Sequence, residues 1–177
     1  MKASLNHTLC RSIPLLVAAT LLVGAPLAAQ SPPSPAPVAT TEPVFLKPGE
    51  IVTPFDAEGI DGVRRHVDYP KGTVTVVFFL SAGCPHCHRM IPVWNKWVEL
   101  RPPNVAMVGV LVDREPPGFF DKIPIAFPLL RSSGRELMEQ YKVSRVPLTL
   151  RIATGGKVED VGVGELDDTR LLEIFKK

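Results

Sequence analysis

Residues 74–92 of the chain read VTVVFFLSAGCPHCHRMIP. The first seven, from Val74 to Leu80, are mostly β-branched or aromatic, which is typical of a strand buried on both faces of a sheet. From Cys87 to Leu100 the apolar residues recur at helical spacing, which predicts an amphipathic helix. The segment is therefore expected to run from a buried strand through a short turn into a helix, with both cysteines at that turn.

The two cysteines, Cys84 and Cys87, lie where the expected helix begins. The start of a helix has free N–H groups and partial positive charge, and both stabilise a thiolate. Pro85 and His86 lie between the cysteines and tune the Cys84 thiol, since His86 adds positive charge or a hydrogen bond. We predict that Cys84 is the nucleophile and that Cys87, one turn into the helix and more buried, resolves the mixed disulfide.

Three other uses of a cysteine pair have to be weighed. An inert structural disulfide does not explain why the pair lies at a strand-to-helix turn with a histidine between the cysteines. The string Cys84-x-x-Cys87-His88 matches the attachment site of c-type haem, with His88 as axial ligand, so a haem-binding electron-transfer protein is the alternative function. No metal site is expected, because ligands crowded into five residues make a poor tetrahedral cage.

The N-terminus has the layout of a secretory signal peptide, which we assign to residues 1–29. A basic start is followed by a short apolar run and by small residues before Gln30. The run is short and interrupted for a transmembrane helix, and an uncleaved membrane anchor is the alternative. Cys10 is expected to leave with the leader, so only two cysteines remain. An exported protein with one such pair does not use disulfides to hold its fold, which favours a chemical role.

A proline-rich spacer follows the leader at residues 30–48. It lacks an apolar period, and its prolines favour an extended polyproline II conformation, so we expect a disordered linker. Residues 49–177 are then expected to form one domain. The leader predicts a periplasmic or otherwise exported protein, which is attached to a membrane only if the leader is not cleaved.

The chain beyond the cysteines alternates between strand-like and helix-like patterns. We expect a buried strand at 105–112, an irregular insert at 115–125, a short strand at 127–130, a short helix at 135–141, a hairpin of 147–152 with 158–163, and a final helix capped by Asp167. This succession predicts an α/β domain with a central mixed β-sheet flanked by helices.

Composition and charge exclude two classes of protein. Of the 177 residues 45% are hydrophobic and 21% are charged, so the chain is not disordered by composition. It has 20 Lys and Arg against 18 Asp and Glu; without Lys2 and Arg11 of the leader, 20 − 2 = 18 basic residues balance 18 acidic ones. A near-neutral chain without basic clusters does not fit a nucleic-acid-binding protein.

In order and spacing, these motifs resemble the thioredoxin superfamily over residues 50–177. The likeness rests on the strand before Cys84-Pro85-His86-Cys87, on Pro92, on residues 141–150 with Val146-Pro147, on Gly155-Gly156, and on the closing helix. The resemblance implies a thioredoxin fold and a thiol–disulfide oxidoreductase without a cofactor. Its partners would be protein thiols or disulfides and a second redox protein. A cis peptide bond at Pro147 is also implied, in a loop where the backbone of Val146 pairs with a substrate.

Some positions depart from the thioredoxin pattern. Gly83 stands where many members carry a tryptophan. Phe78 stands where thioredoxin carries a buried acid that assists proton transfer, so a water or His86 has to take that role. Asp113 and Arg114 lie at the end of a strand and are assigned to a solvated loop, with a position near the site as the alternative. The tryptophans Trp94 and Trp97 are assigned to packing rather than to substrate binding.

The resemblance gives two answers on the direction of electron flow. The Pro85-His86 dipeptide is similar to that of the strongly oxidising DsbA enzymes, and stabilising the reduced thiolate makes a disulfide more oxidising. The leader, spacer and modest insert are similar to exported TlpA/ResA-type thioredoxins, many of which reduce disulfides. We therefore predict thiol–disulfide exchange, and His86 favours an oxidant or an exchanger of relaxed specificity.

Overall fold

A computed structural model of the protein describes residues 43–176. The expected signal peptide, residues 1–29, and the spacer up to residue 42 lie outside the described residues. Within the described part of the chain, no helix has both the length and the apolar character needed to cross a bilayer.

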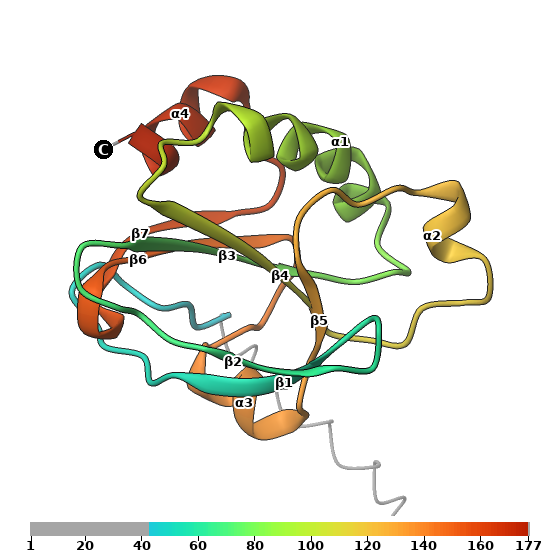
Figure 1. The fold of residues 1–177 in the computed structure, drawn as a ribbon, viewed down its shortest axis with the longest axis horizontal. Coiled ribbons are helices and arrows are strands. Elements are labelled where there is room, and N and C mark those ends of the chain that lie inside the picture. Colours follow the sequence, from blue (N-terminus) through green and yellow to red (C-terminus); the bar gives the residue numbers. More distant parts are fainter. Residues whose placement is uncertain (1–42, 177) are drawn as a thin grey trace, which may run out of the picture. The chain divides into compact units, whose positions relative to one another are not determined.

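A seven-stranded mixed sheet lies at the centre of the domain (Figure 1). Its strands are β1 (Phe55–Gly59), β2 (Arg64–Val67), β3 (Val74–Leu80), β4 (Val105–Leu111), β5 (Leu129–Arg131), β6 (Leu148–Ile152) and β7 (Val158–Val163). They lie in the order β2-β1-β5-β4-β3-β6-β7. The helices are α1 (Pro85–Leu100), α2 (Phe119–Lys122), α3 (Arg135–Gln140) and α4 (Asp168–Lys176). A mixed sheet flanked by helices is the α/β architecture expected from the sequence.

The central strand β3 connects the two halves of the core. It pairs in parallel with β4 and antiparallel with β6, so both of its edges are hydrogen-bonded. Successive side chains point to opposite faces of a strand. Phe78 accordingly packs with residues of α1 and α4, and Phe79 packs with Tyr141 after α3. Figure 1 shows α1 and α4 on one face of the sheet and α3 on the other. The prediction of a strand buried on both faces is confirmed.

Aromatic stacking fixes α1 against the sheet. Trp94 stacks on Phe78 with ring centroids 4.6 Å apart, and Trp97 stacks on Phe175 of α4 at 4.7 Å. Both indole side chains are buried, which confirms that they serve packing. Such pairs contribute about 0.5–1.5 kcal/mol each beyond the burial of their area. The helix that starts beside the cysteines is therefore firmly anchored along its length.

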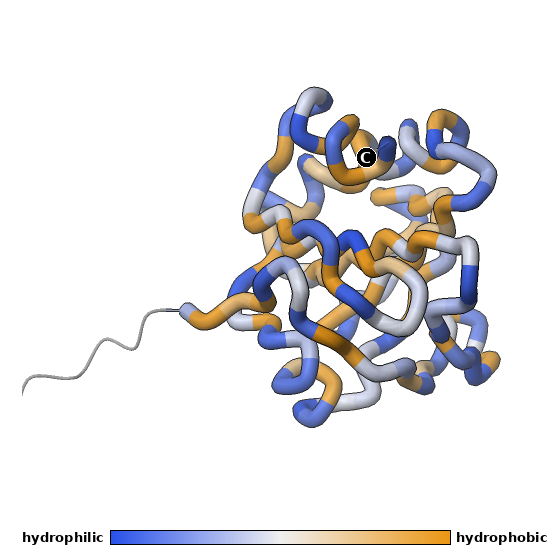
Figure 2. Tube along the Cα trace, turned by 90° about the vertical axis from the view of Figure 1, so that its left-hand side faces the viewer, coloured by the Kyte–Doolittle hydropathy of each residue, from blue (hydrophilic) through white to orange (hydrophobic). Residues whose placement is uncertain are grey.

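The elements predicted after α1 are present, with ends that differ by up to two residues. The strand expected at 127–130 is β5, and the final helix begins directly after Asp167. Asp167 Oδ1 accepts a hydrogen bond from the Arg170 N–H (2.8 Å), as a capping residue does. In Figure 2, hydrophobic segments pass through the middle of the domain, while hydrophilic residues predominate in the outer loops.

The hairpin of β1 and β2 was not predicted from the sequence. Side chains along β1 alternate between buried and exposed, beginning with buried Phe55. In the turn, the Gly62 N–H donates to the Gly59 carbonyl (2.9 Å). Alternation followed by Asp61-Gly62 is a recognisable hairpin signal. Both strands are short and charged on their exposed face, and neither has the continuous apolar run that identified β3.

The boundary between the spacer and the domain lies earlier than predicted. Leu46, which was assigned to the linker ending at residue 48, is buried and packs in the core together with Phe45. The Val44 carbonyl accepts a hydrogen bond from Ser144 Oγ (3.0 Å). Burying a leucine side chain stabilises by about 1.5–3 kcal/mol, which explains why this end of the spacer joins the domain.

Candidate active site

The end of β3 delivers the chain to Cys84 at the start of α1. Cys84 is the N-cap residue with an extended backbone, and its carbonyl accepts the first helical hydrogen bond from the His88 N–H (3.1 Å). Pro85 occupies the first helical position, where a missing N–H is harmless. The first turn contains no acidic residue. The positive end of the helix therefore faces the Cys84 side chain without a carboxylate on that turn to offset it.

The two cysteine side chains lie in different environments. Both are free thiols; Cys84 is half-buried and Cys87 is fully buried. The Ser81 N–H donates to Cys87 Sγ (3.5 Å). Burial is the main cause that raises the pKa of Cys87 to about 12; Cys84 and Asp113 contribute in the same direction, and the Ser81 N–H opposes them. The expected order of burial is confirmed, and Cys87 holds its proton at neutral pH.

This difference predicts how the two thiols react with iodoacetamide. Cys87 in the C84S variant should be alkylated about 100-fold or more slowly at pH 8 than Cys84 in the C87S variant, because a pKa near 12 leaves little thiolate. The rate for Cys87 should keep rising through pH 10. Mass spectrometry of timed samples measures both rates. Equal rates at pH 8 would contradict the assigned environments.

The loop before β6 lies against Cys84. The Val146–Pro147 peptide bond is cis, and Cys84 Sγ donates to the Val146 carbonyl at 3.9 Å. The Pro147 carbonyl accepts a hydrogen bond from the Gly164 N–H (2.8 Å), which ties the loop to the end of β7. Residues that the resemblance placed together, Cys84 with Val146 and Pro147, are thus together in the structure.

Asp113, at the end of β4, holds the turn that leads into the cysteine pair. Its carboxylate accepts hydrogen bonds from Ser81 Oγ (2.6 Å), the Ala82 N–H (2.7 Å) and the Gly83 N–H (3.3 Å). Asp113 is thus an exposed loop residue, as predicted, and it also lies at the site, which was the alternative. The parallel pairing of β3 and β4 brings the ends of both strands to the same edge of the sheet, which puts this acid beside the active-site turn.

His86 contacts a carboxylate that the sequence did not point to. Its Nδ1 lies 2.5 Å from Glu165 Oε1 and 2.9 Å from Arg89 Nη2, and Arg89 also pairs with Glu165 at 2.6 Å. The hydrogen bonds from Arg89 and, to a smaller extent, from His86 lower the pKa of Glu165 to about 2. Glu165 follows β7 directly after Gly164, in a segment whose sequence shows no recognisable motif.

The position of His88 bears on the haem alternative. Its Nε2 donates to the Ala82 carbonyl (2.7 Å), and its ring lies against Phe119 with centroids 5.7 Å apart. An axial haem ligand would have to break both contacts. Among residues 43–176, no group of three or more His, Cys, Asp or Glu side chains is placed to hold a metal ion.

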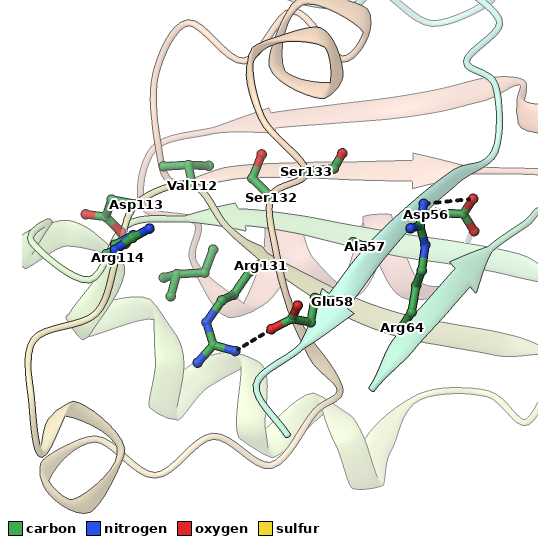
Figure 3. A pocket seen from close by; sticks show the side chains of 11 residues that line it. Asp56, Ala57, Glu58, Arg64, Val112, Asp113, Arg114, Arg131, Ser132 and Ser133 are labelled. Carbon is green, nitrogen blue, oxygen red and sulfur yellow. Dashed lines mark ion pairs between the residues drawn. The ribbon is translucent and has the colours of Figure 1, made fainter. Parts of the chain in front are cut away.

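A pocket of about 590 Å³ opens next to the active-site turn. Figure 3 shows Asp113 and Arg114 at one end of it, with Arg131 and Glu58 joined by an ion pair below them. Side chains of both signs line the pocket, and Ser132 adds a hydroxyl group. The pocket is therefore lined largely by charged and hydroxyl side chains, and through Asp113 it adjoins the turn before Cys84.

Comparisons with known proteins agree with this geometry. The AhpC/TSA family matches residues 48–161. Sporulation thiol-disulfide oxidoreductase A of Bacillus subtilis is 26% identical over 110 residues, which cover 58% of this chain and 67% of that protein. Thiol-disulfide oxidoreductase ResA of Halalkalibacterium halodurans is 23% identical over 137 residues, with coverages of 75% and 77%. The crystal structure of StoA from Bacillus subtilis matches with a TM-score of 0.61 at 21% identity, covering 70% of this chain and 97% of that one. The thioredoxin-like fold is thereby confirmed.

Proposed function

This chain belongs to the AhpC/TSA family, and we propose that it is an exported thiol–disulfide oxidoreductase that exchanges disulfides with proteins through Cys84 and Cys87. The observation that carries this proposal is a half-buried thiol at the start of α1 paired with a fully buried thiol one turn later. The names of its relatives support the same enzyme class. Export rests on the signal-peptide pattern of residues 1–29.

The first step is attack by the Cys84 thiolate on a disulfide of the substrate. A bond forms between Cys84 Sγ and one substrate sulfur, the substrate S–S bond breaks, and the other sulfur leaves as a thiolate that takes up a proton. Free N–H groups at the start of α1 stabilise the attacking thiolate. The accessible position of Cys84 lets it reach a protein disulfide, which Cys87 in its buried position does not reach.

The second step releases the substrate. Cys87 loses its proton and attacks Cys84 Sγ, so that the Cys84–Cys87 disulfide forms and the substrate sulfur leaves as a second thiolate. Two electrons have then passed from the cysteine pair to the substrate, and the reverse sequence oxidises a substrate dithiol. Because burial keeps Cys87 protonated, a base is required. We assign this role to Asp113, whose carboxylate acts on Cys87 electrostatically and is itself exposed to solvent.

The substrate is expected to bind as an extended segment beside the cis-proline loop. The Val146 carbonyl already lies next to Cys84 Sγ, and backbone groups at this position can pair with an incoming strand. Main-chain pairing does not read side chains, which suits an enzyme that acts on several unfolded or partly folded proteins. Arg114 and Ser132, in the neighbouring pocket, offer contacts for residues flanking the substrate cysteine.

Equilibration with glutathione tests the proposed function and its direction. The purified protein is incubated in buffers of graded ratios of reduced to oxidised glutathione, and its free thiols are trapped and counted by mass spectrometry. A dithiol–disulfide transition of Cys84 and Cys87 is expected. A potential near about −120 mV would identify an oxidant, and one near about −270 mV a thioredoxin-like reductant. Failure of the pair to equilibrate would overturn the proposal.

A haem stain tests the alternative function. Covalently attached haem resists denaturation and keeps its colour on a gel, whereas a redox enzyme of the proposed kind gives no signal. The protein has to be taken from an exporting host that matures cytochromes c, so that a negative result is informative. A stained band that disappears in the C87S variant would establish the cytochrome function instead.

A further inference from the structure

A cluster of three charged or ionisable side chains, His86, Arg89 and Glu165, lies beside the cysteine pair. His86 and Arg89 project from the first turns of α1, and Glu165 comes from the segment between β7 and α4. Arg89 contacts Glu165 through both Nε and Nη2, at 3.1 Å and 2.6 Å, and His86 Nδ1 lies 2.5 Å from the same carboxylate. Glu165 is thus the common partner of both groups.

The charges of this cluster act on the attacking thiol. Arg89 lies on α1, the helix that begins at Cys84, and its pKa is raised chiefly by Glu165 and to a smaller extent by Cys84. Arg89 keeps its charge over the whole working pH range. Glu165 stays ionised as well, since its pKa is lowered to about 2. One fixed negative charge therefore opposes the positive charges that α1 presents to Cys84.

We propose that Glu165 is a positioning residue that holds His86 and Arg89 and, by offsetting the charge of Arg89, makes the Cys84–Cys87 disulfide less oxidising. This inference rests on the proposed function and deepens it. A histidine between the cysteines increases oxidising power only as far as its charge is free to stabilise the thiolate. Here the same imidazole and the neighbouring guanidinium face a carboxylate. The dipeptide Pro85-His86 is then not sufficient to make the protein a strong oxidant.

The relevant equilibrium is the reaction of the reduced protein with oxidised glutathione. The protein gives up two electrons and two protons and forms the Cys84–Cys87 bond, and the disulfide of glutathione is split into two thiols. Any change that stabilises the Cys84 thiolate favours the reduced protein. Removing the charge of Glu165 leaves Arg89 without its carboxylate partner. The equilibrium should therefore shift toward the reduced protein.

The experiment measures this equilibrium constant at pH 7.5 for the wild type and for E165Q. The variant is expected to shift about three- to tenfold toward the reduced form, which corresponds to about 15–30 mV. E139Q is the matched control, because it removes one charge from a similar Arg–carboxylate pair, Arg135–Glu139, on the distant helix α3. E139Q should equilibrate like the wild type, and circular dichroism checks that all variants are folded.

Two further variants separate an electrostatic role from a structural one. R89Q should shift the equilibrium toward the disulfide, because Glu165 then acts on the site without its main counter-charge. The double variant E165Q/R89Q should return close to the wild type. E165Q within twofold of the wild type, or E165Q and R89Q shifting in the same direction, would overturn the inference. Neither result affects the proposed function, which fails only if the wild type does not equilibrate with glutathione.

Discussion

The C84S variant is expected to lose disulfide exchange, with a fall in rate of at least about 10³-fold, while C87S forms the first bond and then stops. Removing an enzyme's nucleophile typically produces losses of this size or larger. Cys84 is the half-buried thiol that meets the substrate, and Cys87 is buried behind it. The two variants should therefore fail at different steps, although each lacks a single sulfur atom.

Incubation with oxidised glutathione distinguishes these failures. C87S should accumulate a stoichiometric mixed disulfide with one glutathione per chain, because the remaining Cys84 attacks but no resolving thiol follows. C84S should stay unmodified over the same time, since burial keeps Cys87 protonated. Intact-mass spectrometry records both products, with the wild type as control. If the two variants were modified at the same rate, the assignment of nucleophile and resolving cysteine would be wrong.

The D113N variant is expected to release mixed disulfides about 10²-fold more slowly than the wild type at neutral pH. This is the lower end of what a positioned general base contributes. The carboxylate of Asp113 carries three hydrogen bonds of the turn from Ser81 to Gly83 and raises the pKa of Cys87 by its charge. An amide in its place accepts no proton from Cys87. The first attack by Cys84 should change much less than the second step.

The pH dependence of the second step distinguishes a general base at position 113 from a residue that only supports the turn. The rate of the second step in D113N should rise steeply with pH and approach that of the wild type as the pH nears the Cys87 pKa, which is lower in this variant because the Asp113 charge no longer raises it. S81A is the matched control, because it loses the hydroxyl contact to Asp113 but keeps the carboxylate. It should slow the step by only about fivefold, the equivalent of one ordinary hydrogen bond. A loss in D113N that is the same at every pH would show that Asp113 only supports the turn.

The local features of the site could be read from residues 74–92. A continuous β-branched and aromatic run predicts a buried strand, and the spacing of Met90, Ile91 and Trp94 predicts the helix that buries them. The position of Cys87 one turn after Cys84 then follows from helix geometry, as does its greater burial. These relations involve residues within one turn of each other, so they depend on the order of amino acids alone.

Contacts between residues distant in the chain could not be predicted in this way, as His86 and Asp113 illustrate. His86 was predicted to assist Cys84 because it is its near neighbour in the chain, yet its ring lies on Glu165. Asp113 is an exposed loop residue, and its carboxylate also holds the turn before Cys84. Each of these contacts joins groups from different parts of the fold. The residues next to His86 and Asp113 in the sequence do not indicate which groups these two contact.

The strand and helix around the cysteine pair and the α/β class could be predicted from residue order, because each follows from local periodicity. Only the tertiary structure decided which groups surround the sulfur atoms. Asp113, Val146 and Glu165 reach the site across separations of 30, 62 and 79 residues. They meet because β3 lies between β4 and β6 and β7 ends beside α1, an order of strands fixed by packing over the whole domain.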